Sequence, residues 1–224
     1  MAVVCDFDGT ATLFDVGDEI SKRFGGESHW ESESARFRRG ELDTRGIIQA
    51  IYIKVLAPED ELRAFAAQTA RLRPGFAELV AACRDRGAPF VLASGGLRQY
   101  IEAVLAAHLP DGLRDHVRVL ANEGVFTPEG LRVGFPTEAA ARELGCTACG
   151  SCKRVAVAEV RKLGAEHVIG VGDGFADRCL AQTADSLWAR EGSYLHRWCL
   201  QNLVPHTAFS ALDGVARAVA GFPA

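Results

Sequence analysis

The stretch VVCDFDGT, residues 3–10, places two carboxylates, Asp6 and Asp8, directly after a short apolar run. A buried carboxylate is unfavourable unless a charge or hydrogen bonds compensate it. Such a pair can bind a hard divalent cation through oxygen ligands, while one carboxylate attacks phosphorus and the other transfers protons. The alternative interpretation is a strand that ends in an Asp-Gly turn and carries no chemistry.

Further polar residues follow later apolar runs in the same way. Ser94 and Gly95 end one such run. Asp173 and Asp177 follow another, and Lys153 begins the helical pattern before it. Because ligands bind at the carboxyl ends of strands in open α/β sheets, we expect these groups to converge. The carboxylates suit Mg²⁺, and the hydroxyl, glycine amides and ammonium suit an anion such as phosphate.

The elements that must position these residues indicate an α/β protein with a parallel sheet. Five short apolar segments predict strands covered on both faces, at residues 3–7, 89–94, 116–122, 167–172 and 186–190. Two amphipathic segments predict helices, one over 74–87 between Pro74 and Gly87, the other over 153–164 with Leu163 on its apolar face. Residues 121–133 predict a β-hairpin around TPEG.

One long interval breaks the alternation of strand and helix. Residues 13–73 carry three helical patterns, at 14–25, 32–56 and 57–72, and lack a convincing strand. We therefore expect a small helical cap domain over 13–73, inserted after the first strand of a core domain made of 1–12 and 74–224.

The composition and charge of the chain exclude several classes of protein. The chain has 224 residues, 48% of them hydrophobic, and a formal net charge of −4. This charge predicts that it binds neither nucleic acid nor an anionic membrane. Its apolar runs are too short to span a bilayer, and its beginning lacks the pattern of a signal peptide. We expect a cytoplasmic protein with reduced cysteines, among which Cys5, Cys83, Cys179 and Cys199 fill the core. A homodimer is compatible with the sequence, which does not select an oligomeric state.

Four segments in order resemble the motifs of the haloacid dehalogenase-like (HAD) phosphohydrolases: DFDGT at 6–10, Ser94, Lys153 and GDGFAD at 172–177. The resemblance covers essentially the whole chain. It implies a Rossmann-like core with a cap, and a reaction in which Asp6 is the nucleophile and Asp8 the general acid and base. It also implies that Mg²⁺ is held by Asp6, the backbone carbonyl of Asp8, and Asp173, while Asp177 orients the metal's surroundings or Lys153.

The segment CTACGSCK, residues 146–153, carries three regularly spaced cysteines, Cys146, Cys149 and Cys152. Such spacing suggests a metal, but zinc normally takes four ligands, and His167 or Asp173 as the fourth is a guess. A plain thiol-rich loop is the other interpretation. The segment resembles the cysteine-rich stretch before the lysine in methylthiopentenyl-phosphate phosphatases and, more loosely, in phosphocholine and phosphoethanolamine phosphatases.

The resemblance leaves several substrates open. It implies that the substrate is a small phosphorylated metabolite, with the enol phosphate of methionine salvage as the first candidate. Cap residues such as Phe37, Ile48 and Tyr52 would contact the part of the substrate beyond the phosphate. Phosphoserine phosphatases share the cap type, and in that case Asp15 would bind the amine and Arg45 the carboxylate, although the usual arginine position is Gln49 here. A phosphotransferase and a phosphate-binding regulatory protein without turnover are the remaining alternatives.

Overall fold

The computed structural model describes residues 1–223, whose centre is a seven-stranded sheet in the order β4-β3-β2-β1-β5-β6-β7. Neighbouring strands are parallel, except that β3 and β4 form an antiparallel hairpin. The strands are β1 (Ala2–Cys5), β2 (Phe90–Leu97), β3 (Val117–Thr127), β4 (Gly130–Gly134), β5 (Val168–Gly172), β6 (Ser186–Arg190) and β7 (Thr207–Phe209). The predicted parallel α/β sheet and the hairpin are therefore confirmed.

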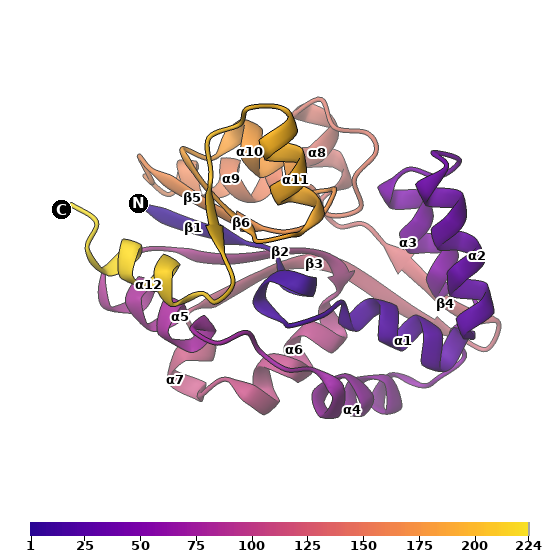
Figure 1. Cartoon of the computed structure of the whole chain (residues 1–224). Coiled ribbons are helices and arrows are strands. Elements are labelled where there is room, and N and C mark those ends of the chain that lie inside the picture. Colours follow the sequence, from indigo (N-terminus) through magenta and orange to yellow (C-terminus); the bar gives the residue numbers. More distant parts are fainter. Residues whose placement is uncertain (224) are drawn as a thin grey trace.

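Helices cover both faces of this sheet (Figure 1). Side chains alternate across β1, so Val3 and Cys5 join one buried apolar cluster while Ala2 and Val4 join another. One face packs against α5 (Phe76–Asp85), α6 (Arg98–His108) and α12 (Asp213–Ala220), and the other against α9 (Lys153–Lys162), α10 (Arg178–Thr183) and α11 (Tyr194–Gln201). The short helices α7 (Asp111–Arg114) and α8 (Glu138–Glu143) lie between these elements in the chain.

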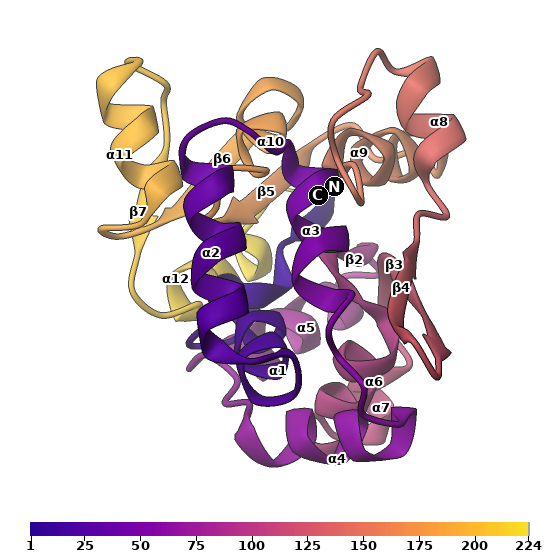
Figure 2. The same cartoon turned by 90° about the vertical axis from the view of Figure 1, so that its right-hand side faces the viewer.

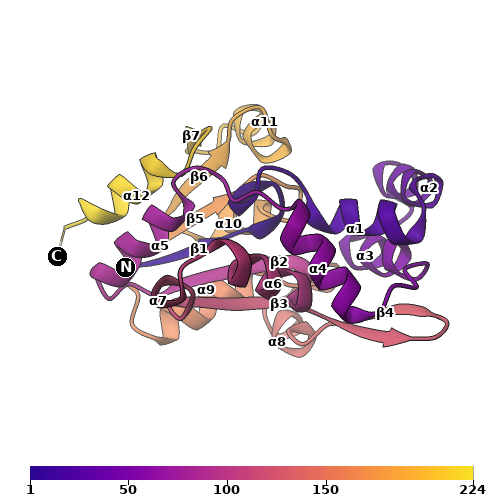
Figure 3. The same ribbon diagram turned by 90° about the horizontal axis from the view of Figure 1, so that it is seen from below.

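The interval after β1 begins with one irregular turn, η1 (Phe7–Ala11), and continues as four helices, α1 (Val16–Gly25), α2 (Glu27–Arg38), α3 (Thr44–Tyr52) and α4 (Glu59–Thr69). The carboxylates of Asp15 and Asp43 accept backbone amides at the beginnings of α1 and α3, which is how such N-caps start a helix. Figures 1 and 3 place α1, α2 and α3 at the end of the sheet away from both termini. Figure 2 shows α2 and α3 side by side in front of the strand ends, whereas α4 packs against α6.

Several boundaries differ from the sequence prediction, each for a local reason. The predicted helix over 32–56 is two helices, α2 and α3, because the chain turns at Gly40 with a φ of 76°. Leu163 is 64% exposed, since α9 ends before it and the chain leaves the apolar face there. Pro74 precedes the N-cap Gly75 of α5 and is not in the first turn. The edge strand β7, with two exposed residues out of three, lacks an apolar run that would predict it.

Candidate active site

A buried lysine joins two strand-end carboxylates at the carboxyl edge of the sheet. Lys153 begins α9, and its Nζ lies 2.7 Å from Oδ1 of Asp6 and 2.8 Å from Oδ1 of Asp177. All three side chains are almost completely buried. Burial alone would lower the pKa of Lys153, but the charges of Asp177 and Asp6 raise it well above its usual value. The lysine is therefore a fixed positive charge beside Asp6.

Asp173 completes a group of three carboxylates. Carboxylate oxygens of Asp6, Asp173 and Asp177 lie within 4.8 Å of one another. Asp173 accepts hydrogen bonds from the Thr10 hydroxyl at 2.7 Å and from Arg190 at 3.0 Å. Burial, followed by the charge of Asp177, raises the pKa of Asp173. Crowded, desolvated carboxylates repel one another, and a hard divalent cation relieves that repulsion, so this donor set fits Mg²⁺.

Asp177 is held by the backbone around it. Its Oδ2 accepts the amides of Asp173 and Gly174, at 2.9 and 2.7 Å, while its Oδ1 faces Lys153. A Cβ on Gly172 would lie 2.5 Å from the Asp177 carboxyl carbon, so this close approach requires glycine. Asp177 is thereby placed to orient Lys153 and the loop that carries Asp173.

Asp8 has a separate set of partners. Its Oδ2 accepts the hydroxyl of Tyr100 at 2.6 Å and faces the Ser94 hydroxyl at 3.3 Å, while its Oδ1 accepts the Val16 amide at 2.9 Å. Burial raises the pKa of Asp8 to about 6, and the hydrogen bond from Tyr100 opposes that rise. A carboxyl with a pKa near the working pH suits proton transfer in both directions.

Ser94 and Gly95 lie in an irregular part of β2, where the pairing with β3 shifts register between Ala93 and Leu97. Such bulges re-aim side chains next to active sites. The Ser94 hydroxyl accepts the Gly96 amide at 2.9 Å, and Asn122 on β3 donates to the Gly95 carbonyl at 2.7 Å. The turn is therefore fixed from both sides, with the Ser94 hydroxyl held near Asp8.

A buried arginine, Arg73, fixes the turn η1. Its guanidinium donates to the carbonyls of Gly9, Thr10 and Thr12 at 2.7 to 3.0 Å. The turn also needs Gly9, because its φ is 76° and a Cβ there would lie 2.8 Å from the Asp173 carboxylate. Arg73 therefore holds the backbone between Asp8 and the first cap helix in one shape.

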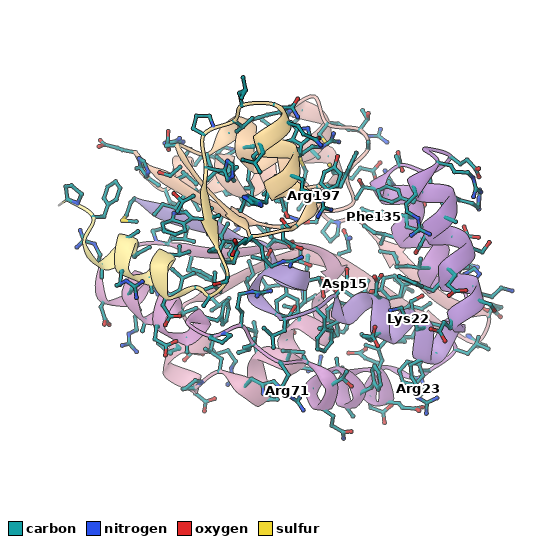
Figure 4. All side chains as sticks on the ribbon, in the orientation of Figure 1. Asp15, Lys22, Arg23, Arg71, Phe135 and Arg197 are labelled. Carbon is teal, nitrogen blue, oxygen red and sulfur yellow. The ribbon has the colours of Figure 1, made fainter. Side chains whose placement is uncertain are left out.

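One cavity of about 220 Å³ is lined by Asp6, Asp8, Asp177, Ser94 and Lys153. The cap contributes apolar walls through Phe37, Ile47, Ile48, Ile51 and Tyr52, and acids through Asp15 and Asp18. Asp15 lies at the beginning of α1, in the middle of the molecule (Figure 4). Its side chain lines this recess and is exposed to solvent, while desolvation by the surrounding protein, followed by the charges of Asp8 and Asp18, raises its pKa.

Arg45 does not belong to the lining of that cavity, contrary to its predicted position at the substrate. Its two terminal nitrogens donate to Glu138 at 2.6 and 2.8 Å. Its guanidinium also stacks on Phe135, 4.5 Å from the ring centre, and Phe135 is labelled in Figure 4. Arg45 therefore ties α3 to the beginning of α8 and to the segment before it.

The cysteines also differ from the prediction. The sulfurs of Cys146, Cys149 and Cys152 lie within 4.8 Å of one another. Cys5, Cys83 and Cys199 are buried in the apolar core as predicted, but Cys179 is not core filler. It lines a recess together with Cys149 and Arg154, beside the cysteine loop.

Sequence reasoning missed several residues of the site, namely Thr10, Arg73, Tyr100, Asn122 and Arg190. Thr10 carried a signal, because it directly follows the Asp-Gly pair. Tyr100 occupies an apolar position of α6, where an aromatic residue predicts only core packing. Arg73 and Arg190 reach the site by tertiary contacts that no local pattern marks.

Comparison with known proteins matches residues 3–182 to the family of haloacid dehalogenase-like hydrolases. A 2-hydroxy-3-keto-5-methylthiopentenyl-1-phosphate phosphatase from Geobacillus thermodenitrificans is 31% identical over 217 residues, which cover 96% of this chain and 93% of that protein. A protein of the same name from Brevibacillus brevis is 29% identical and covers 97% and 94% of the two chains.

Solved structures share the fold at lower sequence identity. A HAD family hydrolase from Salmonella enterica superposes with a TM-score of 0.75 at 17% identity, covering 99% of this chain and 72% of that one. A phosphoserine phosphatase solved as a phospho-aspartyl intermediate analogue has a TM-score of 0.69 at 17% identity, covering 96% and 97%. By the match of its sequence and by its fold, this chain belongs to the haloacid dehalogenase-like hydrolase family.

Proposed function

We propose that this protein is a phosphatase that hydrolyses a small phosphorylated metabolite through a phosphorylated Asp6. The observation that carries the proposal is the cavity in which Asp6, Asp8, Ser94 and Lys153 meet. A nucleophile, a proton-transfer group, a hydroxyl donor and a cation in one small recess are what phosphoryl transfer requires. The curated relatives are themselves named as phosphatases.

Mg²⁺ would be held by Asp6, Asp173 and the backbone carbonyl of Asp8. The oxygen donors described above support this set of ligands. The bound ion would supply positive charge to the carboxylates and to the phosphoryl oxygens. Lys153 would supply further positive charge, and Ser94 with the Gly95 backbone would donate hydrogen bonds to the phosphoryl group. Asp177 would keep Lys153 in place.

In the first step a carboxylate oxygen of Asp6 bonds to phosphorus while the ester bond from phosphorus to the leaving oxygen breaks. Protonated Asp8 gives its proton to that leaving oxygen, and the alcohol departs. In the second step Asp8, now a carboxylate, removes a proton from water, which attacks phosphorus and releases inorganic phosphate from Asp6. A pKa of about 6 for Asp8 suits both roles.

For the substrate we propose 2-hydroxy-3-keto-5-methylthiopentenyl-1-phosphate, the compound named for the curated relatives. The apolar cap walls around Ile48 suit an uncharged thioether tail. Within residues 1–223, Lys153 is the only basic residue that lines the cavity, and two carboxylates already engage it. A substrate carboxylate such as that of phosphoserine would therefore lack a partner.

Asp15 fits the same choice. Its carboxyl lines the recess and can hydrogen-bond a hydroxyl group of the substrate. We further propose that residues 13–73 form the cap that binds the part of the substrate beyond the phosphate. We also propose that the protein works in the cytoplasm, in keeping with its seven free cysteines.

The experiment is a comparison of kcat/KM with Mg²⁺ for the methylthiopentenyl phosphate, phosphoserine, phosphocholine and phosphoethanolamine. We expect the first to exceed the others. If phosphoserine led by tenfold, about 1.4 kcal/mol of transition-state preference, the proposed substrate would be wrong although the phosphatase assignment would stand. Failure to hydrolyse all four and p-nitrophenyl phosphate as well would contradict the phosphatase assignment.

A further inference from the structure

Four cysteines from two separate parts of the chain converge beside the active site. Cys146, Cys149 and Cys152 lie in the loop between α8 and α9, and their sulfurs are within 4.8 Å of one another. Cys179 comes from α10, beyond β5, and lines one recess together with Cys149 and Arg154, although its sulfur is outside the group of three that lie within 4.8 Å of one another. All four are free thiols. The tertiary structure thus brings a fourth cysteine beside the loop, whose three cysteines alone lack a fourth ligand.

The separation of the sulfurs suits one metal ion. Four thiolates arranged as a tetrahedron around Zn²⁺, with Zn–S bonds of about 2.3 Å, lie about 3.8 Å apart. The loop cysteines fall within this range of approach, at no more than 4.8 Å. A four-iron cluster would bind each thiolate to a different iron atom and hold the sulfurs farther apart. The geometry therefore favours a single ion over a cluster.

The surroundings supply compensating positive charge. The Arg154 guanidinium lines the same recess as Cys149 and Cys179. The Nε of Arg154 is buried without a hydrogen-bond partner in the described structure, so it is available to a thiolate. A hydrogen-bond donor beside a ligating sulfur is an outer contact that orients the metal ligand and affects the affinity for the metal. Thiolate character is what a metal ligand requires.

We propose that Cys146, Cys149, Cys152 and Cys179 bind one Zn²⁺ in a closed structural site, distinct from the Mg²⁺ position. Binding releases the thiol protons to solvent and leaves the four sulfurs as thiolates. A closed set of four sulfurs is typical of structural and not catalytic zinc.

The site would brace the ion pair between Lys153 and Asp177. Cys152 directly precedes Lys153 in the chain, and Cys179 lies two residues after Asp177. One ion bound by both cysteines therefore fastens the beginning of α9 to the beginning of α10. The zinc ion would therefore help to position Lys153 and Asp177 in the active site. The presence of the zinc site does not depend on the reaction proposed above.

The test is elemental analysis of the full chain, purified reduced, without a chelator or a metal-affinity tag. We expect close to one zinc per chain in the wild type. Cys179→Ser should lose at least tenfold in zinc affinity, whereas Cys199→Ser, which removes a buried thiol elsewhere in the core, should keep the full content. Zinc content in Cys179→Ser equal to that of the wild type would overturn the assignment of the fourth ligand.

A second measurement uses the wild type alone, so it does not depend on how the variants fold. Chelator-treated, reduced protein is titrated with Co²⁺ and then with Zn²⁺. We expect the intense absorption of tetrahedral cobalt with thiolate ligands, abolished by one equivalent of Zn²⁺. A wild type that holds less than a tenth of an equivalent of zinc and gives no such absorption, or one in which mass spectrometry finds the four cysteines in disulfides after purification under reducing conditions, would overturn the proposal.

Discussion

The hydroxyl of Tyr100 on α6 donates a 2.6 Å hydrogen bond to Oδ2 of Asp8, at the beginning of the irregular turn η1. The contact joins residues 92 positions apart in the chain. It sets the proton affinity of the group that we propose as the acid of the first step. Burial raises the pKa of Asp8 to about 6, and this hydrogen bond holds the rise in check.

Tyr100→Phe should therefore shift a pH dependence. Only protonated Asp8 can donate to the leaving oxygen, so kcat/KM for an alkyl phosphate should fall as pH rises past about 6. Removal of the hydroxyl destabilises the carboxylate, raises the pKa of Asp8 and moves that fall to higher pH. Tyr194→Phe, which alters a tyrosine outside the Asp8 contacts, is the control. If kcat/KM of Tyr100→Phe fell at the same pH as in the wild type, or at a lower pH, the assignment of Asp8 as the acid would be contradicted.

Asp8→Asn should separate substrates by their leaving groups. The amide lacks a proton to transfer, so kcat for an alkyl phosphate should fall by about 10²–10⁴-fold. p-Nitrophenyl phosphate releases a stable phenolate, and the loss should be much smaller for it. A series of aryl phosphates, analysed as log kcat/KM against leaving-group pKa, measures this. Equal losses along the whole series would mean that Asp8 is not the acid.

Lys153→Met should destabilise the protein. It leaves the buried carboxylates of Asp6 and Asp177 without their shared cation, and loss of one partner of a buried ion pair costs about 3–5 kcal/mol. Lys162→Met, at the exposed end of the same helix, is the matched control and should change stability little. Urea unfolding without added metal gives both free energies. Equal stability of the two variants would contradict a charged Lys153 in the pair.

Gly96→Ala should disturb the turn in β2 that carries Ser94 and Gly95. A Cβ at this position would lie 1.7 Å from the Tyr100 hydroxyl and 2.9 Å from Oδ2 of Asp8, so the turn or Tyr100 must move. We expect a loss of about 1–3 kcal/mol in stability, as for other overpacked sites, together with a fall in kcat. Gly112→Ala, where a Cβ has open space, is the control. An unchanged kcat in Gly96→Ala would show that the turn need not be this tight.

The sequence predicts most of the acidic site because its signals are local. Asp6 and Asp173 each follow a buried strand, and parallel strands necessarily bring their ends to one edge. Lys153 begins α9 as predicted, which brings its amine to the same edge. These residues are set by the strand and helix boundaries, and those boundaries can be recognised from apolar runs.

Residues that reach the site from other parts of the fold could not be found in this way. Tyr100 has the pattern of a core residue, and Cys179 lies in a helix whose packing on the cysteine loop no periodicity indicates. The resemblance to phosphoserine phosphatases predicts that Arg45 would bind a substrate carboxylate. In the structure Glu138, 93 residues away, binds its guanidinium instead.

The proposed reaction depends on Asp6, which carries the phosphoryl group between the two steps. Asp6→Asn should abolish turnover, because the amide has the shape of the carboxylate but is a poor nucleophile, and circular dichroism should report an unchanged fold.

The most direct measurement traps the intermediate in the wild type. The protein is mixed with a phosphate ester and Mg²⁺, quenched in acid during turnover and reduced with borohydride, which converts an aspartyl phosphate into homoserine. Peptide mass spectrometry then locates the change. We expect homoserine at position 6, dependent on substrate and absent from Asp6→Asn. Robust turnover without modification at position 6, or with homoserine at another aspartate, would contradict the proposed role of Asp6.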